Sequence, residues 1–149
     1  MQATRILPDL QASLLCEDVR QEVTGNFILI GVIGVIRVPR LPIVAARLCV
    51  FNRWTAGVGQ FHEKVRLIAP DGETVVRESQ VRFALKEPTH HAINVSMLTQ
   101  LKFEKAGVYH VEVTVDDVMK LRYAIPLIHQ PPPQPPGGAP PAPPEKPAD

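Results

Sequence analysis

The sequence predicts an all-β protein: an antiparallel two-sheet β-sandwich of about eight strands, either immunoglobulin-like or C2-like. The first indication is that runs rich in Val, Ile, Leu, Phe and Thr recur about every ten residues between turn residues. The second is that several runs alternate apolar and polar residues, as strands with one buried face do. The third is that no apolar pattern of helical period extends beyond about two turns.

Composition divides the chain into three parts. An N-terminal extension (1–11) precedes a β domain (12–129), and a proline-rich tail (130–149) follows it. Ten of the 16 prolines lie in the tail. Proline fixes φ and removes backbone donors, so we expect the tail to be disordered with polyproline II character. The remaining length suits one domain with its own apolar core.

The expected strands cover residues 12–19, 26–38, 43–54, 60–69, 74–85, 91–97, 107–115 and 119–127. The clearest turn is Pro-Asp-Gly-Glu at 70–73, because Asp-Gly between alternating runs favours a tight hairpin. The Asp-Asp pair at 116–117 predicts a second hairpin. Imperfect alternation in 74–85 predicts a bulge or a bend. Residues 98–105 are open between a short helical turn and an irregular loop.

The segment 27–36 is the least typical of a strand in a two-sheet fold, because both of its faces are apolar. Ile28, Ile30 and Val32 lie on one face, and Phe27 begins the other. Two interpretations stay open. The second face is covered by the protein's own chain, or it is a subunit interface, since a contiguous exposed apolar face usually has a partner. Ile28, Ile30 and Val32 are therefore the candidate interface residues.

Charge and hydropathy exclude several classes of partner. The net charge is +1 without a basic block, and aromatic residues make up only 5%, so we expect no nucleic-acid binding. The longest apolar run is about ten residues, too short to span a bilayer. The first residues do not read as a secretory signal, so a cytoplasmic location is expected. In that compartment Cys16 and Cys49 are expected to be buried free thiols.

We expect no enzymatic activity, no cofactor and no metal site. The five histidines are explained as surface residues: His62, His90, His91, His110 and His129. The acidic turns at 71–73 and 116–117 supply too few oxygens for calcium, which takes about six to eight. Both cysteines lie in apolar runs, whereas a catalytic cysteine needs an electropositive, accessible setting.

The expected function is therefore that of a non-enzymatic protein-interaction or structural module, with an unknown protein partner or with self-association. The alternative is a small-ligand or carbohydrate-binding β-sandwich. Its support is Trp54 beside the loop 56–59, if that side chain is exposed; the other interpretation is that Trp54 caps the core. The tail is interpreted as a spacer or as a docking peptide for an aromatic groove.

Three segments carry a resemblance to a known group of proteins. They are SLLCEDVRQEVTGNFILIGVIGVIRVPRLP at 13–42, the Pro-Asp-Gly hairpin, and LKFEKAGVYHVEVTVDD at 101–117. The region 13–128 resembles small bacterial β-sandwich proteins classified only as a domain of unknown function. The resemblance implies a single β domain and a bacterial source, and it transfers no catalytic residue.

Overall fold

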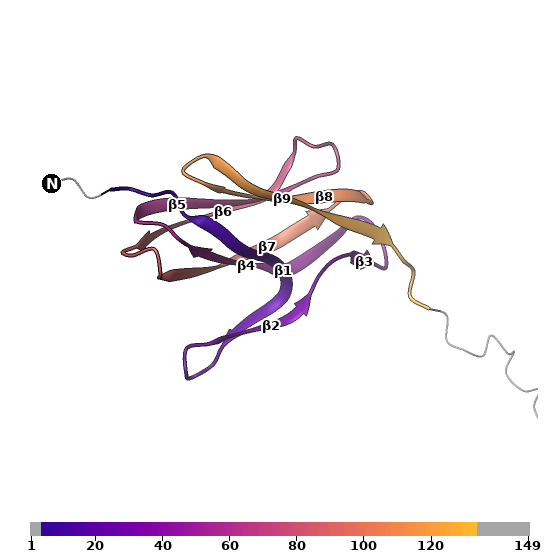
Figure 1. Cartoon of the computed structure of the whole chain (residues 1–149). Helices are drawn as coiled ribbons and strands as arrows, with labels where there is room; N and C mark the ends of the chain where they lie inside the picture. Colours follow the sequence, from indigo (N-terminus) through magenta and orange to yellow (C-terminus); the bar gives the residue numbers. More distant parts are fainter. Residues whose placement is uncertain (1–3, 134–149) are drawn as a thin grey trace, which may run out of the picture.

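The structure, a computed structural model, describes residues 4–133, and within them the chain forms nine strands and no helix (Figure 1). The strands are β1 (Asp9–Gln21), β2 (Phe27–Val32), β3 (Ile36–Val38), β4 (Ile43–Thr55), β5 (Gly59–Ile68), β6 (Val75–Leu85), β7 (His91–Phe103), β8 (Gly107–Val115) and β9 (Val118–His129). The all-β prediction is confirmed. Most of the tail, 134–149, and residues 1–3 lie outside the described residues, so the predicted disorder is not addressed. Among residues 4–133, no helix is of a length and hydropathy that would cross a membrane.

The strands form two sheets, one of four strands in the order β2-β1-β4-β7 and one of five in the order β3-β9-β8-β5-β6. Every pairing between neighbours is antiparallel except that of β3 with β9, which is parallel. The antiparallel pairing expected from the sequence therefore holds except at one edge. There the chain crosses from one sheet to the other and reaches β9 running in the same direction.

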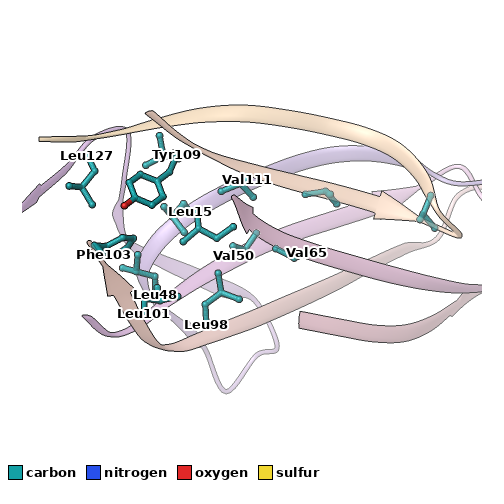
Figure 2. Close-up of a cluster of buried hydrophobic side chains, with 14 of the residues drawn as sticks. Leu15, Leu48, Val50, Val65, Leu98, Leu101, Phe103, Tyr109, Val111 and Leu127 are labelled. Atoms are coloured by element: carbon teal, nitrogen blue, oxygen red, sulfur yellow. The ribbon is translucent and has the colours of Figure 1, made fainter. Parts of the chain in front are cut away.

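One apolar core lies between the two sheets (Figure 2). Leu15, Val50 and Leu98 enter it from the four-stranded sheet, and Val65 and Val111 enter it from the five-stranded sheet. Over most of their length the strands present alternate residues to the core, as a period of two requires. A fully buried aliphatic side chain of this kind stabilises the fold by about 1.5–3 kcal/mol.

The predicted strand 26–38 is wrong as a single element, because it divides between the sheets. Phe27–Val32 forms β2 at the edge of the four-stranded sheet, and Ile36–Val38 forms β3 at the edge of the five-stranded one. The chain turns between them, and Ile33 and Ile36 pack against the core. The structure therefore has nine strands instead of eight. The apolar character of the run reflects this crossing, because successive parts of it meet different surroundings.

Residues 98–103, expected as a helical turn or a loop, continue strand β7 to Phe103. Gln100 has a φ of 52°, which reverses the alternation of faces along the strand. Leu98 and Leu101 both point into the core as a result. Their spacing of three residues resembles a helical pattern, although the backbone stays paired with β4.

The predicted turns and the bulge are confirmed. The hairpin at 70–73 has Gly72 at a φ of 80°, and the Asp71 carboxylate accepts hydrogen bonds from the backbone N–H groups of Glu73 and Thr74, each at 2.8 Å. The pairing of β5 with β6 shifts register after Leu67, leaving Val76 as the extra residue of a bulge.

Candidate functional site

The three candidate interface residues lie on the exposed strand β2, and we call this surface the β2 edge: Ile28, Ile30 and Val32. Their relative exposures are 45%, 41% and 56%. Among the described strands β2 pairs only with β1, so the backbone groups along its outer side have no partner strand. Apolar side chains next to unpaired backbone groups make this edge a surface on which another chain can pack or pair.

The β1–β2 hairpin that presents the β2 edge is closed by a short turn. The backbone N–H of Glu22 donates to the Asn26 carbonyl at 2.7 Å, and that of Gly25 donates to the Glu22 carbonyl at 2.9 Å. Further along, Gly31 has a φ of 64°, and a Cβ there would lie 2.7 Å from the Glu17 side chain. Glycine is therefore favoured at position 31 chiefly by its backbone conformation, because the exposed Glu17 side chain is flexible and can move away from a Cβ.

Charged groups border the β2 edge on strand β1. Asp18 lies directly opposite Ile30, and Arg20 lies opposite Ile28. The Asp18 carboxylate accepts a hydrogen bond from Arg20 at 2.8 Å and lies 3.2 Å from the Arg47 guanidinium on β4. The hydrogen bond from Arg20 is the main cause that lowers the pKa of Asp18. The apolar surface is thus flanked by compensated charges.

The hairpin also covers the outer face of β4. In Figure 1, β1 curves along its length, and the β1–β2 hairpin projects to the side of β4 that faces away from β5, β8 and β9. Val50 points into the core, so Cys49 and Phe51 point to the opposite face of the same strand. The Phe27 ring of β2 packs edge-on against Phe51, with the ring centres 6.1 Å apart. This contact makes a second, smaller buried cluster outside the main core.

The two cysteines lie on the same outer face of the four-stranded sheet as Phe51. Cys16 and Cys49 are 0% and 1% exposed, and both are free thiols, as predicted. They lie directly opposite each other on β1 and β4. Burial raises the pKa of both thiols; the other thiol adds to the shift at Cys16, and Asp18 adds to it at Cys49. In this closed form neither thiol is activated as a nucleophile.

A buried carboxylate lies in the main core, at a position that the sequence reading passed over. Glu63 of β5 is 1% exposed, and its Oε1 accepts hydrogen bonds from Asn52 Nδ2 at 2.7 Å and from Trp54 Nε1 at 2.8 Å. Its Oε2 has no hydrogen-bond partner among the described residues. Burial raises the pKa of Glu63, and the hydrogen bonds from Trp54 and Asn52 oppose that shift. The sequence pattern could have indicated this burial. Glu63 lies two residues from both Phe61 and Val65, which point inward, so in a strand it shares their face.

Trp54 is fully buried, which removes the exposed aromatic on which the carbohydrate alternative rested. Its ring stacks on Phe83 with the ring centres 5.5 Å apart, and its indole nitrogen is bound by Glu63. The interpretation that Trp54 caps the core is therefore the correct one. The buried carboxylate thus links β5 to β4 by accepting hydrogen bonds from an indole and an amide.

A cleft of about 530 Å³ opens between the β5–β6 turn and the end of β7. Arg77, Lys102 and Lys105 line it, together with Asp71 and Glu104. Arg77 donates to the Gln100 carbonyl at 2.7 Å, and Lys102 lies 3.4 Å from Glu104. Most of the charged side chains in the cleft thus already have neighbours.

The predicted turn at 116–117 connects β8 to β9. Asp116 and Asp117 have φ values of 47° and 65°, and Asp116 accepts a hydrogen bond from the His62 backbone N–H at 2.9 Å and pairs with Arg5. Within residues 4–133, no group of three or more His, Cys, Asp or Glu side chains has an arrangement that would hold a metal ion.

These features define a small two-sheet β protein with an exposed apolar edge strand and a buried pair of thiols behind it. The chain belongs to a family of unknown function, DUF6941, whose profile matches residues 11–128. This match confirms the expected resemblance to a domain of unknown function. No curated protein shows significant similarity to the sequence.

Proposed function

We propose that this domain is a non-enzymatic protein-interaction module that associates with a second copy of itself through the β2 edge. The observation that carries the proposal is the exposure of Ile28, Ile30 and Val32 on a strand that pairs on one side only. An apolar patch of this kind is complementary to its own copy across a two-fold axis, so both copies bury the same residues.

Electrostatics around the β2 edge favour this occupant. Asp18 is compensated by Arg20 and Arg47, so two copies of the surface do not meet with unpaired like charges. The net charge of +1 adds little repulsion between whole chains. The unpaired backbone of β2 offers further hydrogen-bonding groups to a partner strand.

Sedimentation velocity and light scattering over a concentration series test the proposal on the full-length protein. We expect a monomer–dimer equilibrium that Ile30→Lys weakens about tenfold or more, because a buried isoleucine contributes roughly 1.5–3 kcal/mol. The matched control is Val118→Lys, which changes an equally exposed valine on the other sheet and is expected to leave association unchanged. A chain that stays monomeric throughout the series contradicts the proposal.

Affinity capture from the native cell separates self-association from binding to a different protein. The full-length chain is compared with a truncation after His129. A different partner that is retained on truncation and lost in Ile30→Lys would assign the β2 edge to that protein and overturn the proposed dimer. A partner lost on truncation would assign binding to the tail.

A small-ligand function is the second candidate, and the cleft lined by Arg77, Lys102 and Lys105 favours it. Its volume of about 530 Å³ lies within the range of small-molecule sites. The three cations outnumber the two carboxylates in the cleft, Asp71 and Glu104, and this excess of positive charge favours an anionic ligand. A panel of anionic metabolites and sugars should raise the melting temperature of the wild type but not of Arg77→Ala. No shift across the panel counts against this function.

The remaining expectations belong to the same proposal. We infer that the two-sheet fold is a β-sandwich of immunoglobulin-like or C2-like type, that the protein is bacterial and cytoplasmic, and that the proline-rich tail is a disordered spacer. The shared core between the sheets supports the sandwich. An experimental structure, together with fractionation of the native cell, tests these points.

A further inference from the structure

We propose that Cys16 and Cys49 form an intramolecular disulfide when the β1–β2 hairpin lifts from β4 in the presence of a small-molecule disulfide such as oxidised glutathione. The buried thiol pair is therefore a site of reversible oxidative modification. This inference does not depend on the dimer proposed above.

The register of the four-stranded sheet places the two cysteines face to face. Val32, Cys16, Cys49 and Met97 follow one another across β2, β1, β4 and β7 in a single row of directly opposed residues. Opposed residues of antiparallel strands have Cα atoms about 4.5–5.5 Å apart. A disulfide needs a Cα separation of about 4.4–6.8 Å. The backbone of the folded protein therefore already meets the main requirement for the bond.

The β1–β2 hairpin controls access to the pair. Both thiols are almost fully buried, and the contacts that hold the hairpin against β4 include the Phe27–Phe51 packing and the Asp18–Arg47 ion pair at 3.2 Å. Lifting the hairpin removes these contacts and exposes the outer face of β4. The raised pKa of each thiol keeps both protonated in the closed form. Reaction is consequently expected only from the open form.

The chemistry consists of two thiol–disulfide exchanges. One cysteine loses its proton, and its thiolate attacks a sulfur of oxidised glutathione, forming a mixed disulfide and releasing one glutathione thiolate. The second cysteine then loses its proton and attacks the protein sulfur of the mixed disulfide, releasing the second glutathione. The protein loses two electrons and two protons, and one glutathione disulfide is reduced to two thiols. The directly opposed second cysteine makes the mixed disulfide short-lived.

Mass spectrometry after alkylation tests the proposal on the full-length protein incubated with oxidised glutathione in native buffer. We expect a monomeric product that is lighter by two hydrogens and in which neither cysteine can be alkylated. Trypsin should yield the peptide 6–20 linked to the peptide 48–53. A wild-type chain that keeps both thiols, accumulates glutathione adducts or forms only intermolecular disulfides overturns the proposal.

Two sets of variants serve as controls. Cys16→Ala and Cys49→Ala each leave one thiol, so oxidation should stop at a single glutathione adduct. Phe27→Ala removes the ring that covers Phe51 and should accelerate disulfide formation several-fold. The matched control Phe83→Ala removes a partly buried ring that stacks on Trp54, on the other side of the four-stranded sheet, and should not. Equal acceleration in both variants would mean that oxidation follows global unfolding, and it would overturn the role of the hairpin.

Discussion

Replacing Glu63 by leucine and by glutamine separates two properties of its buried carboxyl group, the acceptor oxygen and the charge. Oε1 accepts hydrogen bonds from Trp54 at 2.8 Å and from Asn52 at 2.7 Å, in a region closed to solvent. Glu63→Leu removes the acceptor from both donors. Glu63→Gln keeps an acceptor oxygen at the same position and removes the charge.

The expected magnitude follows from the two donors. A buried donor without an acceptor destabilises the folded state by about 1–3 kcal/mol, so the pair amounts to roughly 2–6 kcal/mol. The buried leucine offsets about 1.5–3 kcal/mol of this. We therefore expect Glu63→Leu to lower the free energy of unfolding by about 0.5–3 kcal/mol. Glu63→Gln should be at least as stable as the wild type at neutral pH, because it no longer buries an ionisable group.

Urea unfolding provides the assay, because the chain has a single tryptophan and this residue is fully buried. Fluorescence of Trp54 reports exposure of the core, and far-UV circular dichroism gives an independent probe for Glu63→Leu, in which the indole loses its hydrogen bond. Coincident transitions with an unchanged m-value would establish two-state unfolding. A Glu63→Leu variant as stable as the wild type, or a Glu63→Gln variant as unstable as Glu63→Leu, would refute the assigned role of the hydrogen bonds.

Two further predictions use the same assay. Because burial raises the pKa of Glu63 above its ordinary value of 4.5, the folded state binds more protons than the unfolded state above that pH. The stabilisation from this group is complete below pH 4.5 and is lost as the pH rises through the pKa of Glu63 in the folded state. The free energy of unfolding of the wild type, relative to that of Glu63→Gln, should therefore fall from acid to neutral pH. A difference between the two proteins that does not change with pH contradicts this prediction. Gly31→Ala should destabilise the fold by about 1–2 kcal/mol from its positive φ alone. Adding Glu17→Ala to Gly31→Ala should restore only the part of the lost stability that comes from the 2.7 Å contact. If the changes in free energy of unfolding of the two single variants simply add in the double variant, the contact is unimportant.

Most of the strands were predictable, because alternation survives wherever one face of a strand meets the core. The failures occur where the backbone departs from regular extension. At Gln100 a positive φ reverses the faces, so Leu98 and Leu101 acquire a helix-like spacing within a strand. Between β2 and β3 the chain leaves one sheet and joins the other, an event that depends on the positions of β1 and β9. The local sequence pattern of 26–38 contains no information about the positions of strands β1 and β9.

The candidate site was predictable only in part. The excess of apolar residues in 27–36 pointed to Ile28, Ile30 and Val32, since a sequence pattern reveals a second apolar face directly. Whether that face is covered depends on tertiary structure, and the structure leaves it exposed. The pairing of Cys16 with Cys49 depends on the register between β1 and β4, strands far apart in the chain. Spacing along the sequence could not indicate it.

Two sets of polar contacts across the core join the four-stranded sheet to the five-stranded one, and one of them anchors the start of β1. Ser13 near the start of β1 is 3.1 Å from the Tyr123 hydroxyl of β9, and Glu63 of β5 binds two side chains of β4. Because hydrogen bonds are directional, these contacts define the relative position of the two sheets. Apolar packing alone specifies that position less sharply. Burial raises the pKa of Tyr123 to about 12, so its hydroxyl stays neutral and keeps this contact.

Beyond Cys16, strand β1 leaves the anchored region and enters the hairpin, which touches the body through Phe27 and Asp18. Far fewer apolar contacts hold this segment than hold the core, and segments of that kind open first. The β2 edge and the cover over the thiols belong to the same hairpin, and Val32 of that edge lies directly opposite Cys16. A dimer that holds the β2 edge would therefore slow oxidation of the thiols, and a disulfide that ties β1 to β4 would restrain the surface through which the dimer forms.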